Sequence, residues 1–228
     1  MQRMIVVFLG GPGAGKGTQA QALMHYLPVP RISTGDLLRN EVKRDTELGR
    51  KIGKQLSSGF LVHDELVNKV LGNRINSPDC HYGFMLDGYP RTLEQAVALQ
   101  SQLRTEDKIV VIEINVDTEM MIQRMMSRLT CTSCGRVYNA ASVPPQIAGT
   151  CDACRAPLAR RADDQETVIR NRFRTFYAET LPVRDYFWQF GVYNHVDGMR
   201  SPEEVALDIL TILDIEGFPL NAPVTRRT

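Results

Sequence analysis

A glycine-rich segment near the beginning of the chain constrains the fold more than any other feature. Residues 10–18 read Gly-Gly-Pro-Gly-Ala-Gly-Lys-Gly-Thr, directly after the apolar run Met4–Leu9 and directly before a helix-like stretch from Gln19. A glycine turn between a buried strand and a helix N-terminus aims several backbone N–H groups at one spot, where an anion binds. Lys16 adds a charge that reaches β- and γ-phosphates, and the Thr18 hydroxyl would lie near Mg²⁺. The segment predicts a nucleoside triphosphate site, although Gly17 stands where the general motif has Ser or Thr.

The rest of the chain alternates short apolar runs with helical patterns. The runs that have the length and β-branched content of buried strands are Ile5–Leu9, Phe84–Leu86, Ile109–Ile114 and Val192–Val196. Helical patterns occupy Glu65–Ile75, Leu93–Leu103, Thr118–Ser127, Gln165–Tyr177 and Pro202–Leu213. This alternation predicts an α/β fold with a parallel sheet flanked by helices, in which ligands bind beyond the carboxyl ends of the strands.

Size and charge exclude several classes of protein. The chain has 228 residues, a net charge of +1 and 43% hydrophobic residues, which is the composition of a globular domain with insertions. Near-neutral charge argues against a nucleic-acid partner. The first apolar run is too short for a signal peptide, and no run approaches the roughly 20 apolar residues of a membrane helix. We therefore expect a cytoplasmic protein with no membrane partner.

Two segments interrupt the alternation and predict the domain organisation. Residues 33–62 contain helical patterns but no convincing strand, and residues 127–164 are rich in Cys, Pro and Arg. We expect a core domain of residues 1–32, 63–126 and 165–217, a helical insertion at 33–62 and a second insertion at 127–164. The segment 218–228 carries prolines and no periodicity, so we expect a flexible tail.

Four of the five cysteines have the spacing of a metal site. Cys131 and Cys134 form one CxxC pair, and Cys151 and Cys154 form another after sixteen intervening residues. This spacing fits a tetrahedral four-thiolate zinc site, which leaves no open position and is therefore structural. Disulfides are disfavoured in a chain without a secretory signal. Cys80 stands alone, and we expect it to be buried and unreactive.

Several motifs together resemble one family. The phosphate loop with Gly-Thr after its lysine, the run Ser33–Arg39, the run Asp87–Thr92 (Asp-Gly-Tyr-Pro-Arg-Thr) and the run Arg161–Asp164 followed by Arg172 occur in the order found in nucleoside monophosphate kinases. The long cysteine-bearing insertion makes the resemblance closest to bacterial adenylate kinases with a zinc-bearing lid. The resemblance covers residues 4 to about 215. It implies a P-loop kinase fold with a five-stranded parallel sheet, an NMP-binding insertion at 33–62 and a lid at 127–164.

The resemblance also implies a reaction and roles for individual residues. The reaction is the Mg²⁺-dependent transfer of a phosphoryl group from ATP to AMP, giving two ADP, by a monomeric enzyme. Catalytic roles fall on Lys16, Arg91, Arg128, Arg161 and Arg172. ATP would contact Gly13, Ala14, Gly15, Lys16, Gly17, Thr18, Arg128, Val137, Tyr138 and Arg200. AMP would contact Thr34, Arg39, Phe60, Leu61, Val62, Gly88, Tyr89, Pro90, Arg91, Gln95, Arg161 and Arg172. Asp87, at the end of an apolar run, would order Mg²⁺ through water.

Alternatives to this interpretation remain open at this point. A GTP-dependent AMP kinase would differ only in the base pocket near Tyr138 and Arg200, and a UMP or CMP kinase commonly has a shorter lid. A nucleic-acid-binding zinc ribbon joined to a nucleotide switch is a distant alternative, which the near-neutral charge disfavours. Asp163 and Asp164 have two interpretations: they hold arginines of the lid, or they are the acidic N-terminus of the following helix.

Overall fold

A five-stranded sheet forms the centre of the molecule. The computed structural model describes residues 2–44 and 46–221. All neighbouring strands of the sheet run parallel, in the order β2-β3-β1-β4-β8. The strands are β1 (Met4–Leu9), β2 (Arg31–Ser33), β3 (Gly83–Asp87), β4 (Lys108–Asn115) and β8 (Tyr193–Asp197). The predicted α/β fold with a five-stranded parallel sheet is confirmed.

Four of these strands coincide with the apolar runs of the sequence, and β2 does not. Strand β2 has three residues, of which only the central Ile32 is buried, and it lies at an edge of the sheet beside β3. The polar neighbours Arg31 and Ser33 break any apolar run. An edge strand this short therefore gives no hydrophobic signal, because only one of its side chains enters the core.

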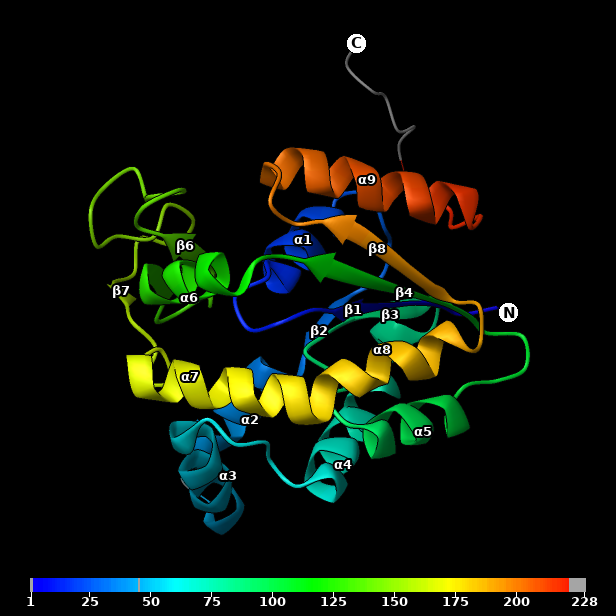
Figure 1. Cartoon of the computed structure of the whole chain (residues 1–228), viewed down its shortest axis with the longest axis horizontal. Helices are drawn as coiled ribbons and strands as arrows, with labels where there is room; N and C mark the ends of the chain where they lie inside the picture. Colours follow the sequence, from blue (N-terminus) through cyan, green and yellow to red (C-terminus); the bar gives the residue numbers. More distant parts are fainter. Residues whose placement is uncertain (1, 45, 222–228) are drawn as a thin grey trace.

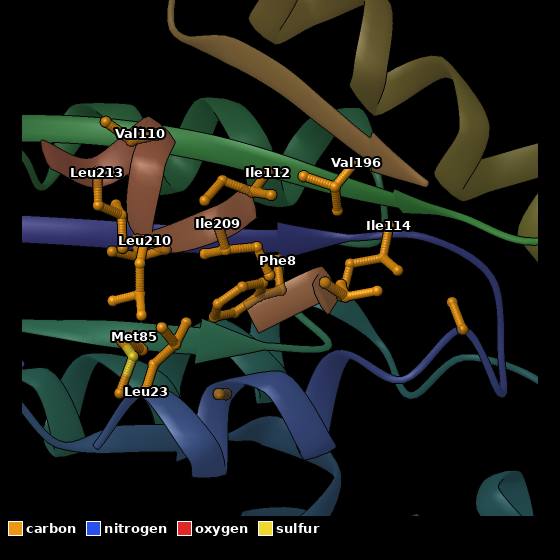
Figure 2. Packing of buried hydrophobic residues seen from close by; sticks show 14 of the residues in the cluster. Phe8, Leu23, Met85, Val110, Ile112, Ile114, Val196, Ile209, Leu210 and Leu213 are labelled. Carbon is orange, nitrogen blue, oxygen red and sulfur yellow. The ribbon is translucent and has the colours of Figure 1, made fainter. Parts of the chain in front are cut away.

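Helices cover both faces of the sheet, and each face has its own hydrophobic core. In β1, Val6 and Phe8 point to one core while Ile5 and Val7 point to the other, as the two-residue period of a strand requires. The first core is closed by α1 (Lys16–Leu23), α6 (Thr118–Met126) and α9 (Pro202–Ile215). Figure 2 shows Ile209, Leu210 and Leu213 of α9 packed against this face of the sheet.

The second core is closed by α4 (Asp64–Ile75), α5 (Leu93–Ser101) and α8 (Leu181–Trp188). The helical patterns of the sequence match α4, α5, α6, α7 (Glu166–Thr175) and α9 to within a few residues at each end. A π-helical turn, Phe176–Thr180, joins α7 to α8, and α8 had no prediction. A 3-10 turn, Pro78–Cys80, precedes β3, and Cys80 is buried there.

The two segments that interrupt the alternation have their own structure. Residues 33–62 contain α2 (Thr34–Lys43) and α3 (Glu47–Ser58). The other segment holds a separate antiparallel sheet in the order β6-β5-β7, with β5 (Arg128–Cys131), β6 (Val137–Asn139) and β7 (Leu158–Ala159). In Figure 1, α7 lies between this small sheet and α3. Both segments therefore flank the same end of the molecule.

The expectation of a flexible tail from residue 218 is wrong for the residues up to 221. Phe218 is buried in the first core, and Leu220 packs against that core. The backbone N–H of Asn221 donates to the carbonyl of Tyr26 at 2.8 Å. The aromatic side chain of Phe218 is buried against the first core, although the prolines around it in the sequence indicated no ordered structure. Residues 222–228 of the expected tail lie outside the described residues.

Among residues 2–44 and 46–221, no helix combines the length and the apolar character that crossing a bilayer requires.

Candidate active site

The glycine-rich loop lies between β1 and α1, at the carboxyl end of the central strand. Helix α1 begins at Lys16, three residues earlier than the sequence indicated, and directly follows Gly15, whose left-handed conformation (φ 101°) glycine adopts without steric cost. The Lys16 ammonium donates to the carbonyls of Gly10 (2.7 Å) and Gly11 (2.8 Å). Burial lowers the pKa of Lys16 to about 8, although the nearby Asp87 carboxylate opposes this shift.

The absence of a side chain at residue 17 has a steric explanation. A Cβ at Gly17 would lie 2.9 Å from the Asp87 carboxylate and 3.0 Å from the Arg31 guanidinium. These two side chains form an ion pair at 2.7 Å on the neighbouring strands β3 and β2. A serine or threonine here would have to displace that pair. Glycine at residue 17 avoids this displacement, and the hydroxyl of the next residue, Thr18, lines the site.

A cavity of about 830 Å³ opens in front of this loop, and its wall is strongly cationic. Among the described residues, a single carboxylate, that of Asp87, lines it. The basic side chains on the wall are Lys16, Arg31, Arg39, Arg91, Arg124, Arg128, Arg161, Arg172 and Arg200. Burial, together with repulsion from neighbouring arginines, lowers the pKa of Arg161 and of Arg172 to about 10. Several of these arginines also pair with acidic side chains outside the lining, but in the lining itself positive charge predominates, which suits a polyanion.

Asp163 and Asp164 hold two of these arginines. Arg128 Nε donates to Asp164 at 2.7 Å, and Arg172 pairs with Asp163 at 2.9 Å and with Asp164 at 3.4 Å. The Asp164 side chain is only 1% exposed. Helix α7 begins at Glu166, so both aspartates precede its first turn. The structure therefore favours the first interpretation of this pair, as partners of the arginines.

A second, smaller cavity of about 50 Å³ adjoins the first and shares Arg39, Arg91 and Arg172 with it. It lies between the α2–α3 segment and the sheet. Nine of the residues that the sequence assigned to the second nucleotide line it: Thr34, Arg39, Phe60, Leu61, Val62, Gly88, Arg91, Gln95 and Arg172. The two cavities meet at the arginines, so two ligands in them would face each other there.

Three residues of that set lie elsewhere. Pro90 and Arg161 line the larger cavity rather than the smaller one. Tyr89 is fully buried, and the single hydrogen of its hydroxyl is shared between two acceptors, Asn68 Oδ1 (2.7 Å) and the backbone carbonyl of Gln95 (3.0 Å). Tyr89 thus supports the wall of the smaller cavity from behind.

The residues expected at the far end of the triphosphate site all line the larger cavity. Val137 is 40% exposed there, while Tyr138 is buried and its hydroxyl lies 3.5 Å from the sulfur of Cys151. Arg200 forms ion pairs with Glu204 and Asp208 of α9, which keeps its guanidinium at the surface. The residues expected along the glycine loop, Gly13, Ala14, Gly15, Lys16, Gly17 and Thr18, line the same cavity.

Two cationic residues on the wall were not predicted from the sequence. Arg31 and Arg124 stand outside every recognised motif, and their approach to the site depends on the pairing of β2 with β3 and on the packing of α6. The one signal for Arg31 is its place two residues before Ser33, since alternate residues of a strand share a face.

The four cysteines of the small antiparallel sheet converge. Their sulfur atoms all lie within 4.8 Å of one another, and the separations Cys131–Cys154 and Cys134–Cys151 are 3.4 and 3.6 Å. Sulfur atoms about 2.3 Å from a tetrahedral Zn²⁺ lie about 3.8 Å apart, whereas a disulfide requires about 2.05 Å. The Tyr138 hydroxyl accepts from the Asp152 N–H (2.8 Å), faces Cys151 and lowers the pKa of that thiol to about 6. The donor set fits a four-coordinate metal ion.

Comparisons with known proteins agree with this geometry. The family profile "Adenylate kinase" matches residues 8–192. A protein of Thermotoga maritima named adenylate kinase is 43% identical over 211 residues, covering 91% of this chain and 96% of its own. Proteins with the same name from Fervidobacterium nodosum and Archaeoglobus fulgidus are each 42% identical and cover 92% of this chain and 97% and 98% of their own lengths. With a cationic double cavity in front of a phosphate loop and this similarity along nearly its whole length, the chain belongs to the adenylate kinase family.

Proposed function

We propose that this chain catalyses the reversible transfer of a phosphoryl group from ATP to AMP, giving two ADP, and so balances the adenine nucleotides. The observation that carries the proposal is the pair of joined cavities whose shared wall is made of arginines. A nucleotide switch needs one such cavity, whereas a transfer between two nucleotides needs two that meet at the phosphates.

ATP would occupy the larger cavity. The backbone N–H groups of the loop from Gly13 to Thr18 would surround its phosphates, with Lys16 and Arg128 adding charge. Lys16 donates to the carbonyls of Gly10 and Gly11. When ATP binds, its phosphates would replace these carbonyls as hydrogen-bond acceptors of the Lys16 ammonium. Val137, Tyr138 and the backbone near Arg200 would contact the base and ribose at the other end.

AMP would occupy the smaller cavity. Arg39 and Arg91 would bind its phosphate, and Gln95, near Thr34, would contact the adenine edge. Phe60, Leu61 and Val62 after α3 and Gly88 to Arg91 after β3 would complete the pocket. The AMP phosphate would then point toward the shared arginines and toward the terminal phosphate of ATP.

The protein's part in the transfer is electrostatic. Phosphoryl transfer needs in-line positioning and stabilisation of negative charge rather than covalent chemistry. Lys16, Arg91, Arg128, Arg161 and Arg172 would supply that charge, with Arg161 and Arg172 bridging the two nucleotides. Arg128 and Arg161 come from segment 127–164, which would act as a lid and exclude water from the reacting phosphate.

The domain division proposed for this mechanism is the one drawn from the sequence. The core would comprise residues 1–32, 63–126 and 165–217, and the AMP-binding insertion residues 33–62. Their separate secondary structure supports this division: α2 and α3 in the insertion and an antiparallel sheet in the lid. Monomeric state and cytoplasmic location stay predictions from the sequence, as does the absence of nucleic-acid and membrane partners.

Two metal ions belong to the proposal. Mg²⁺ would neutralise the phosphate oxygens of ATP, and Asp87, which lines the larger cavity close to Lys16, would order it through water. Zn²⁺ would be held by Cys131, Cys134, Cys151 and Cys154. Because four thiolates fill its coordination, the zinc would stabilise the lid and take no part in the transfer.

Formation of ADP from Mg·ATP and each of AMP, GMP, UMP and CMP tests the proposed reaction. We expect rapid transfer to AMP and slow transfer to the other three. Mg·GTP replacing Mg·ATP should lower kcat/KM. Transfer to a pyrimidine nucleotide in preference to AMP would contradict the assignment of the smaller cavity, and no transfer to any acceptor would contradict the proposal as a whole.

The pKa of Lys16 predicts a pH dependence. Lys16 attracts phosphate only when it is protonated, and its pKa in the free protein is about 8. Above that pH, kcat/KM for Mg·ATP should therefore fall, approaching tenfold per pH unit. Bound phosphates raise the pKa, so kcat at saturating nucleotide should stay nearly constant over the same range. Initial rates from about pH 6.5 to about 9.5 measure both quantities. The variant Lys16→Arg, whose charge persists, should lack the fall, and a flat wild-type profile would refute the explanation.

Loss of one cysteine should affect the lid more than the chemistry. In Cys151→Ser, bound zinc should fall well below one per chain, and Tm should drop by several degrees, because the small lid depends on its metal. The initial rate at 25 °C should stay within about threefold of wild type, since the thiolates do not touch the reacting phosphate. Ser133→Ala, an exposed change in the same loop, is the matched control. Equal heat stability of C151S and wild type would disprove a structural metal.

A further inference from the structure

The amide of Gln95 is held from two sides. Gln95 lines the smaller cavity but is only 2% exposed. Its Nε2 donates to Asp64 Oδ1 at 2.6 Å, and its Oε1 accepts from the backbone N–H of Arg91 at 2.8 Å. Asp64 is the first residue of α4, and it stands behind Gln95 rather than in the lining of that cavity.

Each partner permits one orientation of the amide. A carboxylate only accepts hydrogen bonds, and a backbone N–H only donates them. Turning the Gln95 amide over would place its oxygen against Asp64 and its NH₂ group against the Arg91 N–H, which opposes like charges at both contacts. The orientation is therefore fixed by chemistry, with one lone pair on Oε1 and one N–H on Nε2 left over.

Asp64 is itself held in place. Its second oxygen, Oδ2, accepts from the Thr92 hydroxyl at 2.5 Å, and the oxygen of that hydroxyl caps α5 by accepting from the Gln95 backbone N–H at 3.1 Å. The carboxylate thus links the start of α4 to the start of α5. A positioned group whose supporting bonds are all made loses little freedom when it binds a ligand.

The fixed amide distinguishes the two purines. Adenine presents an amine donor beside an N1 acceptor, whereas guanine presents a carbonyl acceptor beside an N1–H donor. In a fixed amide, Oε1 can accept from the adenine amine while Nε2–H donates to adenine N1. At the guanine edge the same order sets Oε1 against the carbonyl and Nε2–H against N1–H. We propose that Asp64 is a specificity-determining positioning residue, which fixes the Gln95 amide so that it accepts AMP and rejects GMP. This inference rests on the proposed contact between Gln95 and the base of AMP.

The variant Asp64→Asn tests the role directly. An asparagine of the same shape both donates and accepts, so residue 64 no longer opposes the turned-over amide, and only the Arg91 N–H still favours the original orientation. We expect KM for AMP to rise about threefold and kcat/KM for GMP to increase, so that the AMP-to-GMP ratio of kcat/KM falls by at least about tenfold, which corresponds to about one charge-assisted hydrogen bond. KM for Mg·ATP and kcat at saturating AMP should change less than about twofold, because neither depends on the amide.

A matched control separates specificity from stability. Asn68→Ala removes a polar group one turn along α4 that accepts from the Tyr89 hydroxyl and does not touch the Gln95 amide. This variant should keep the wild-type ratio even where its Tm is lower. Should D64N fail to fold, Asp64→Ser, whose shorter side chain removes the carboxylate from Gln95 Nε2, carries the same expected fall in the ratio.

The variant Gln95→Ala separates this inference from the proposed site. If Q95A loses the preference for AMP while folded D64N keeps it, Gln95 reads the base and the role of Asp64 is refuted. If Q95A keeps the preference, the assignment of Gln95 to the base is wrong, and the role of Asp64 fails with it. Loss of the preference in both variants, with N68A unchanged, is the result that we expect.

Discussion

Repulsion among the cations that line one cavity is the constraint on which the rest of the structure depends. Nine basic side chains line the larger cavity against a single carboxylate among the described residues. Burial lowers the pKa of Lys16, Arg161 and Arg172, and repulsion from neighbouring arginines adds to this shift. Such a cluster persists only because rigid elements hold it. The parallel sheet fixes the loop of Lys16, and Asp164 and Asp163 hold Arg128 of β5 and Arg172 of α7 through ion pairs.

The fold distributes these charges over elements that are far apart in the sequence. Lys16 begins α1 in the core, Arg39 belongs to α2, and Arg128 begins β5. Each of these elements has its own support: two hydrophobic cores for the sheet, helix packing for the insertion, and a cluster of thiols with Tyr138 for the small antiparallel sheet. Segment 127–164 has few buried apolar residues and cannot form a stable core alone. This explains why it carries the four thiols of a metal-binding donor set.

Much of this arrangement could be predicted from the sequence, and the remainder has a common physical reason. The phosphate loop, four strands, most helices and the cysteine cluster follow from local patterns. Strand β2 has only one buried residue and therefore gives no such pattern. Phe218 is buried in the first core among residues that are distant in the sequence, so no local pattern indicates its burial. The pairs Arg31–Asp87 and Asp64–Gln95 join positions 56 and 31 residues apart, so neither spacing nor periodicity indicates them.

A molecule that carries two adenosines joined by five phosphates tests most directly whether the two cavities form one site around shared cations. Binding measured by titration calorimetry should show one molecule per chain, an affinity far above that of ATP or AMP alone, and competition with both. The affinity should fall steeply with salt, since the contacts are mainly with phosphate. Two molecules per chain, or competition with only one of the nucleotides, would mean that the cavities do not meet at the arginines.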